Sequence, residues 1–280
     1  MAVGFYYRGK APNRRSELET RNPVLSRYID PEAQNATLRT SVGDVQVPTT
    51  AAPTRPVSAD DVLMRTGFML AFIIGGGLVG WAIAYTSPVV LWGSLIVGIG
   101  LGIANAVMKK IRPILILAYA LAQGVFLGAI SRTFQDAFSS PGSIGVVGNA
   151  VVATAVAFGV MLVLYRTGLI KVTSRFRKMM TIAVVSYLVI ALGSLVSAFF
   201  GVGEGWGFYG MGPLGILLAV LGVALASFSL VLDFDAISFA IGERMPEREG
   251  WRLAFGLVVT LIWLYIEMLR LFALIASSNR

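Results

Sequence analysis

The chain contains no histidine and no cysteine among its 280 residues. These absences exclude histidine-based catalytic triads, His/Cys zinc sites, haem ligation, thiol nucleophiles and disulfide bonds. Carboxylates, hydroxyls, lysine and arginine are the groups left for chemistry, and we expect neither an enzyme nor a bound cofactor. A chain without thiols is compatible with either side of a membrane, so cysteine usage does not indicate a compartment.

Charged residues are also scarce. They make up 14% of the chain, against about 25% in an average soluble domain, while 56% of the residues are apolar. This composition argues against a water-soluble globule and predicts a lipid bilayer, not nucleic acid, as the main partner. The formal net charge is +8, and its placement along the chain is more informative than its sum.

The first 65 residues differ from the rest. Met1–Arg65 carries nine Lys/Arg, seven Asp/Glu and six prolines, and such a segment buries too little apolar surface to offset the entropy of ordering. We predict a disordered cytoplasmic tail at residues 1–57 and a transmembrane domain at residues 58–280. A basic arm that contacts anionic lipid headgroups is a second interpretation of the tail. Ser58, followed by two aspartates, predicts a helix N-cap at the start of the domain.

Seven apolar runs after Arg65 have the length of a membrane-spanning helix. About 20 residues at ~1.5 Å per residue cross the ~30 Å hydrocarbon core of a bilayer. The predicted fold class is therefore all-α, a polytopic bundle of seven transmembrane helices, or six if one run is re-entrant. The runs are Thr66–Tyr85, Val89–Val107, Ile114–Thr133, Ile144–Tyr165, Met179–Phe200, Leu214–Leu232 (with an extension to Ala240 left open) and Trp251–Ala276.

Basic residues are distributed unevenly between the connections. Alternate connections carry eleven Lys/Arg, whereas the others carry only Arg132. Positively charged connections stay in the cytoplasm, so we predict a cytoplasmic N-terminus and an external C-terminus. The eleven residues are Lys109, Lys110, Arg112, Arg166, Lys171, Arg175, Arg177, Lys178, Arg244, Arg248 and Arg252.

Small residues recur every four positions in the first two runs. Gly76 and Gly80 share one helix face, as do Gly98 and Gly102. In lipid, such stripes allow close helix packing. We interpret them as packing surfaces, with a gating hinge as the alternative.

Four ionisable residues fall in or just beyond the last two runs: Asp233, Asp235, Glu267 and Arg270. Ionisable groups inside a bilayer are costly, and each is by default a hypothesis of function. Glu267 and Arg270 are neighbours at i,i+3 on one helix face. They are candidates for an ion path or, alternatively, for a structural ion pair.

The two aspartates occupy different faces of their helix. They are two residues apart, about 200° around the axis, so only one can face the bundle core. Counting from the charged turn at residues 243–249 places Asp235 at the depth of Leu257 and Asp233 at that of Val259 or Thr260. Glu267 lies about 15 Å further along the last helix than Leu257, out of reach of both.

Three segments resemble a known family. They are VLDFDAI (Val231–Ile237), LIWLYIEMLRL (Leu261–Leu271) and YALAQGVFLGAIS (Tyr119–Ser131). The first two are similar to the motifs that end the sixth and seventh spans of the Bax inhibitor-1 family, and the third is similar to that family's third span. The resemblance covers everything after Arg65, and the long tail resembles a bacterial branch.

The resemblance implies a seven-helix protein with its last helix packed centrally. It implies a pH-sensitive calcium leak in a bacterial inner membrane, in which two aspartates on the last two spans share a proton. Asp235 matches the first of these aspartates and is the expected calcium ligand. The second position falls near Thr260, so this chain departs from the pattern. We therefore expect Asp235 to pair with a basic side chain such as Lys109 or Arg112, and acid to break that pair.

Two other functions remain open. A membrane-embedded regulator of other membrane proteins, such as a quality-control protease, would need no ion path. An intramembrane aspartyl protease would need two facing aspartates on neighbouring helices, and the partner for Asp235 is missing from the sequence.

Overall fold

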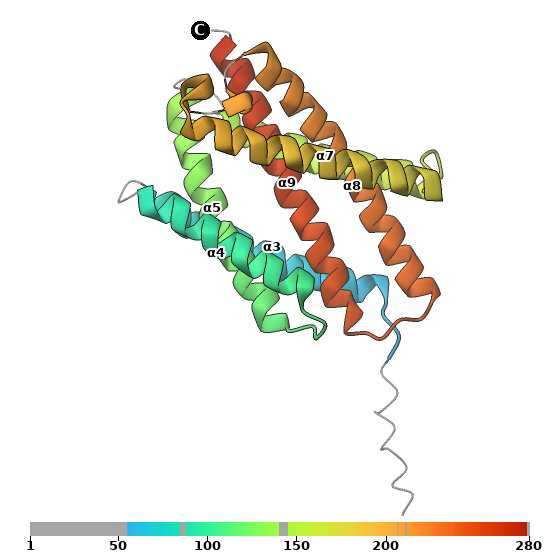
Figure 1. Cartoon of the computed structure of the whole chain (residues 1–280). Coiled ribbons are helices and arrows are strands. Elements are labelled where there is room, and N and C mark those ends of the chain that lie inside the picture. The colour runs from blue at the N-terminus through green and yellow to red at the C-terminus, as the bar shows by residue number, and fades with distance from the viewer. Residues whose placement is uncertain (1–54, 85–87, 140–144, 206, 211, 279–280) are drawn as a thin grey trace, which may run out of the picture. The chain divides into compact units, whose positions relative to one another are not determined.

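The computed structural model describes residues 55–84, 88–139, 145–205, 207–210 and 212–278. The chain divides into two units, Met1–Thr54 and Arg55–Arg280, and the disorder predicted for the tail up to Thr54 lies outside the described residues. The second unit is all-helical in its described part, as predicted (Figure 1). Its helices are α3 (Ala59–Ile83), α4 (Pro88–Val107), α5 (Pro113–Phe138), α6 (Gly145–Arg166), α7 (Ser174–Phe199), α8 (Pro213–Gly242) and α9 (Glu249–Ser278), with two short 3-10 helices, η1 (Val202–Gly205) and η2 (Gly207–Tyr209), before α8.

Seven of these helices are long and apolar enough to cross a membrane. Pro113 and Pro213 stand at the first turns of α5 and α8, where the missing amide hydrogen costs nothing. The sixth run takes the longer of its two predicted forms, because α8 continues without a break to Gly242. Both aspartates of the VLDFDAI segment therefore lie within a continuous helix.

The glycine stripe of the first span packs α3 against α5. A Cβ added at Gly76 would meet the backbone of Leu121 and Gly124, and one at Gly80 would meet the carbonyl of Val125. On α5, Gly124 lies equally close to the backbone of Ile73. The two backbones thus touch directly, which confirms the packing interpretation of this stripe.

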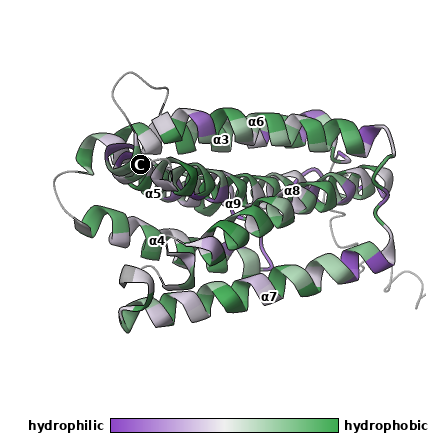
Figure 2. Cartoon of the chain, turned by 90° about the horizontal axis from the view of Figure 1, so that it is seen from above, coloured by the Kyte–Doolittle hydropathy of each residue, from purple (hydrophilic) through white to green (hydrophobic). Residues whose placement is uncertain are grey.

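Helix α9 is the centre of the bundle, as the family resemblance implied. It packs against α3, α5, α6 and α8, and it passes between the α3–α4–α5 group and α7–α8 (Figure 1). Ala254, Val258 and Leu264 are completely buried. The peripheral α7, in contrast, lies at one edge of the bundle (Figure 2), and exposes apolar residues such as Val189 and Val196. That surface suits contact with lipid.

The short segment before α3, residues 55–57, is bound to the turn between α8 and α9. Val57 is buried and donates its amide hydrogen to the Met245 carbonyl at 2.8 Å, while the Arg55 carbonyl accepts from the Glu247 amide at 2.9 Å. The turn between α8 and α9 binds this short segment through backbone groups, which composition does not reveal.

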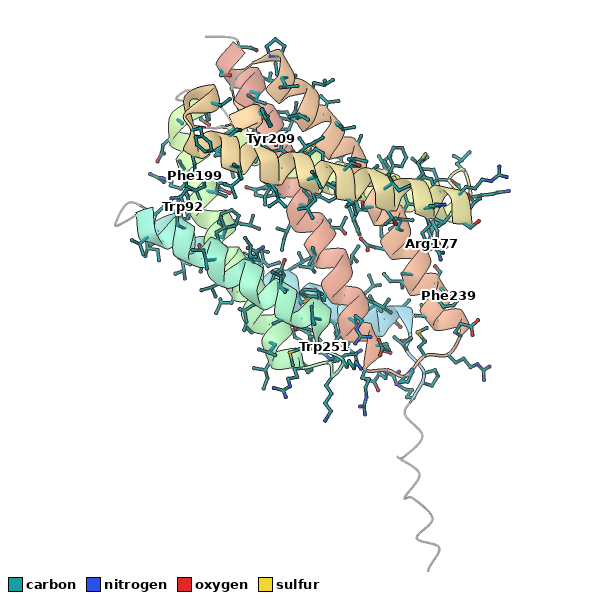
Figure 3. The ribbon with its side chains drawn as sticks, viewed as in Figure 1. Trp92, Arg177, Phe199, Tyr209, Phe239 and Trp251 are labelled. Carbon is teal, nitrogen blue, oxygen red and sulfur yellow. The ribbon has the colours of Figure 1, made fainter. Side chains whose placement is uncertain are left out.

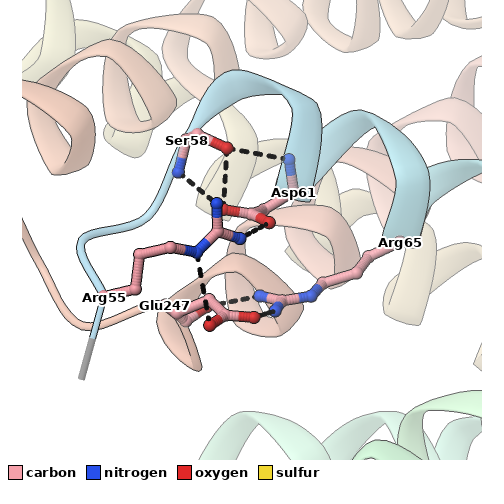
Figure 4. Close-up of polar contacts among 5 residues, drawn as sticks. All are labelled: Arg55, Ser58, Asp61, Arg65 and Glu247. Atoms are coloured by element: carbon pink, nitrogen blue, oxygen red, sulfur yellow. Dashed lines mark hydrogen bonds and ion pairs between the residues drawn. The ribbon is translucent and has the colours of Figure 1, made fainter.

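The predicted N-cap of α3 is confirmed, and it is tied to the same turn (Figure 4). Ser58 accepts the Asp61 amide hydrogen at 3.2 Å, and its own amide donates to the Asp61 carboxylate at 2.9 Å. This reciprocal pair is a capping box. Arg55 binds Asp61, and Arg65 binds Glu247 at 2.8 Å. The start of α3 is thereby fixed beside the α8–α9 turn.

Candidate functional site

Helix α9 carries a polar stripe along one face. Gly256, Thr260, Trp263, Glu267 and Arg270 follow each other at intervals of three or four residues, the spacing that places side chains above one another on a helix. The stripe faces α8 and side chains of α7. We call the stripe, together with Asp233 of α8 and Tyr187 of α7, the α8–α9 seam.

Glu267 is the best-satisfied carboxylate of the seam. Its side chain is 6% exposed and forms an ion pair with Arg270 at 3.1 Å. The Tyr187 hydroxyl donates to Glu267 Oε1 at 2.8 Å, and the indole of Trp263 donates to the same oxygen at 3.2 Å. The predicted i,i+3 pair is therefore present, and it is buried. Two hydrogen-bond donors and one cation, from two helices, surround this carboxylate, although its Oε2 accepts no hydrogen bond among the described residues.

The short helix η2 covers one end of this network. The guanidinium carbon of Arg270 lies 4.1 Å from the centroid of the Tyr209 ring, a favourable cation–π geometry, and Tyr209 is labelled in Figure 3. Across the seam, Gly222 of α8 leaves room for the network. A Cβ at Gly222 would overlap the Tyr187 hydroxyl and the Glu267 carboxylate.

Asp233 lies further along the seam and has no countercharge. Its Oδ1 is 3.7 Å from the position that a Cβ on Gly256 would occupy, and its carboxylate lies beside Thr260, whose hydroxyl donates to the Gly256 carbonyl at 3.3 Å. Its Oδ2 is buried and has no hydrogen-bond partner among the described residues. No ion pair to Asp233 occurs in the part of the chain that the structure describes. The seam therefore contains one uncompensated carboxylate, about 10 Å along α9 from Glu267.

Asp235 points away from the seam, toward α7. Its Oδ2 lies 2.8 Å from Nη2 of Arg177, and the two side chains are 26% and 64% exposed. Arg177 is labelled at the basic end of α7 in Figure 3. The basic side chain beside Asp235 is thus Arg177 of α7, and not Lys109 or Arg112. The two aspartates face different neighbours, as their 200° separation predicted.

Lys109 and Arg112 lie in the connection between α4 and α5. The carbonyl oxygen of Lys109 accepts a hydrogen bond from Arg252 of α9 at 3.3 Å, and Arg112 is the N-cap residue of α5. The sequence places all three basic connections at one end of the bundle. Of their cations, Arg177 lies beside Asp235, because the start of α7 is near that part of α8.

The two aspartates have different surroundings. Asp235, the expected calcium ligand, lies beside Arg177, whereas Asp233 is the carboxylate that adjoins Thr260. The position that the resemblance assigned to a second acid therefore stands beside Asp233. Within the described residues, no group of three or more acidic side chains is close enough to hold a metal ion.

Sequence reasoning predicted the Glu267–Arg270 pair but not the two hydrogen bonds that Tyr187 and Trp263 donate to Glu267. Both residues stand in hydrophobic runs, and Tyr187 is 80 residues from its acceptor. The three- and four-residue spacing from Gly256 to Arg270 was the available signal, since it marks one continuous face of the last helix.

The comparison with known proteins agrees with this architecture. A family model described as Bax inhibitor 1 like matches residues 22–277, nearly the whole chain. No curated protein matches the sequence. Seven apolar helices, a central last helix and the family match lead to one conclusion: the chain is a multi-pass membrane protein that belongs to the Bax inhibitor 1 like family.

Proposed function

We propose that this chain is a pH-sensitive calcium leak channel of a bacterial inner membrane, and that Asp233 is the acidic residue of its ion path. The observation that carries the proposal is the buried Oδ2 of Asp233, which has neither a hydrogen-bond partner nor an ion pair among the described residues. A carboxylate at such depth without a countercharge is costly and takes up a proton or a cation.

Calcium suits this position chemically. It binds oxygen ligands, and a fixed negative charge lowers the barrier for a divalent cation in a medium of low dielectric constant. The Thr260 hydroxyl beside Asp233 adds a neutral oxygen at the same depth. A single carboxylate with weak neighbours favours passage over tight binding, as a leak requires.

The proposed orientation places the basic connections in the cytoplasm. Eleven Lys/Arg lie in or beside them, and the positive-inside rule then puts the N-terminus inside and the C-terminus outside. Asp233 lies nine residues before the end of α8, about 14 Å from it. A cation from the cytoplasm would thus meet Asp233 before the Glu267 network.

The pH response is proposed to come from Asp235 and Arg177. Arg177 is the charged group that α7 places against Asp235, while the α6 residues Phe158 and Tyr165 contact the intervening Phe234. At neutral pH the pair holds the start of α7 against α8. Loss of the Asp235 charge removes the attraction, so we expect flux to rise when the pair is broken.

Purified protein in liposomes tests the proposal. We expect Asp233→Asn to lower calcium flux about tenfold or more, because it removes the fixed charge that faces the cation. Asp235→Asn is the matched control, with the same chemical change on the other helix face. It should raise flux at neutral pH, by at most about fivefold for an exposed pair.

The two variants are expected to change calcium flux in opposite directions. A general loss of folding would lower the flux in both, so it would not explain that result. Arg177→Gln should behave like Asp235→Asn. Equal flux for wild type and Asp233→Asn at every pH would refute the ion path and favour a regulator of other membrane proteins.

A further inference from the structure

An apolar groove of about 720 Å³ opens on the side of the bundle that the α8–α9 seam does not use. Helices α3 and α6 form its two rims, and α5 and α9 form its floor. Gly67, Ile74 and Trp81 line the α3 rim, and Ala155 and Phe158 line the α6 rim. The two rims do not pack against each other in the described part of the chain, so the groove is open toward the surrounding membrane.

Three of the four hydroxyl groups in the groove wall have hydrogen-bond partners within the protein. Ser131 of α5 and Tyr265 of α9 hydrogen-bond to each other at 2.7 Å, and Thr154 of α6 donates to the Ala150 carbonyl of its own helix at 2.7 Å. The fourth, the Thr66 hydroxyl, is buried and has no hydrogen-bond partner among the described residues. The remaining surface is hydrocarbon, and the occupant that fits it is apolar along its length.

The groove is elongated. From Leu63 to Trp81 it follows α3 for about 27 Å, and its volume of about 720 Å³ is spread along this length. Carbon contacts of ~3.5–4 Å make an extended polymethylene chain about 4–5 Å wide. A long apolar groove that is open to the membrane suits such a chain.

One end of the groove has the features of a membrane interface. At Trp81, the guanidinium carbon of Arg132 lies 5.0 Å from the ring centroid, and Arg132 also forms an ion pair with Asp136 at 3.0 Å. Tryptophan and arginine mark the level of lipid headgroups. A cation and a carboxylate side by side are complementary to a headgroup that carries both a phosphate and an amine.

The geometry points to a lipid site: the groove between α3 and α6 holds one acyl chain of a zwitterionic phospholipid, whose headgroup lies at Trp81 and Arg132. This site is separate from the seam proposed for ions.

Two glycines of α3 provide a matched test. A Cβ at Gly67 or at Gly75 would meet no atom within 4 Å, so both positions accept a side chain. Gly67 lines the groove, whereas Gly75 does not. Gly67→Phe therefore fills the groove, and Gly75→Phe adds the same ring to another face of the helix. Ala155→Phe fills the groove from the α6 rim.

The probe is a phosphatidylethanolamine with a photoactivatable acyl chain, added in limiting amounts to the full-length protein in detergent. Mass spectrometry of the crosslinked peptides measures occupancy. We expect crosslinks on α3 and α6 that saturate at one lipid per chain and are displaced by unlabelled phosphatidylethanolamine. Gly67→Phe and Ala155→Phe should lower the amount of crosslinked lipid by about tenfold or more, since several methylene contacts are lost. Gly75→Phe should leave that amount unchanged.

Three results would overturn the proposal. Equal crosslinking in Gly67→Phe and Gly75→Phe would show that the groove does not select the lipid. Labelling that never saturates in wild type would indicate ordinary annular lipid. A change of oligomeric state in Gly67→Phe, with lipid occupancy unchanged, would assign the groove to a protein partner.

Discussion

Tyr187 of α7 donates its hydroxyl hydrogen to Glu267 of α9 across 2.8 Å. The two residues are 80 positions apart, and the backbones of α7 and α9 do not otherwise pack against each other in the described residues. This hydrogen bond, with the contact between the Tyr187 and Trp263 rings at 5.8 Å, connects the peripheral helix to the central one.

Tyr187→Phe is expected to destabilise the protein. The substitution keeps the ring and leaves Glu267 with one donor fewer in a buried position, which costs about 1–3 kcal/mol. The midpoint of thermal unfolding in detergent should fall by several degrees. Tyr165→Phe is the control, since no hydrogen bond of the Tyr165 hydroxyl occurs in the described part of the chain. A similar fall in both variants would contradict the assigned role of the hydroxyl.

Gly222→Ala should disturb the same network from α8. The added methyl group overlaps the Tyr187 hydroxyl and the Glu267 carboxylate, and overpacking of this kind costs about 1–3 kcal/mol. Gly100→Ala in α4 adds the same group where nothing lies within 4 Å. There we expect no loss, and a gain of up to ~1 kcal/mol from helix propensity. Unfolding midpoints that are equal for the two variants would show that the seam tolerates the methyl group.

The orientation can be tested with single cysteines, because the chain contains none. Ser278→Cys, at the end of α9, should react with a membrane-impermeant thiol reagent on intact cells, whereas Ser174→Cys, at the start of α7, should react only after permeabilisation. Permeabilised cells control for accessibility of both sites. Labelling of Ser174→Cys on intact cells would show that the topology is opposite to the proposed one.

Much of the fold could be predicted from local signals. Runs of about 20 apolar residues located the seven helices, Ser58 marked the start of α3, and small residues at Gly76 and Gly80 marked a close helix contact. Each of these signals is contained within a few residues of sequence. The extension of α8 past Asp233 was left open, because two charges interrupt the hydropathy without ending the helix.

The partners of the charged residues were harder to predict. A helix gives the angle between Asp233 and Asp235, but their neighbours depend on how α7 and α9 are rotated and tilted. Arg177, Lys109 and Arg112 are equivalent in the sequence as cations of the basic connections. Only the three-dimensional structure shows that Arg177 reaches Asp235.

Thr260→Asp is expected to create, beside Asp233, the acidic pair that this chain lacks. When both carboxylates are ionised they repel each other in a buried site, so the variant should unfold at a lower temperature than wild type at neutral pH. A proton on one of them removes the repulsion, and the difference should therefore narrow as pH falls. In liposomes, the same change should move the midpoint of calcium flux toward neutral pH.

Two further variants isolate the interaction. Thr260→Asn adds a side chain of the same shape without charge, and its unfolding temperature relative to wild type should not depend on pH. In the Asp233→Asn background, Thr260→Asp has no carboxylate to repel, so most of its pH dependence should disappear. If Thr260→Asp has the same pH dependence with and without Asp233, the two positions are not neighbours. Asp233 would then have other neighbours than Thr260. The proposal that Asp233 is an uncompensated charge on the ion path would be contradicted.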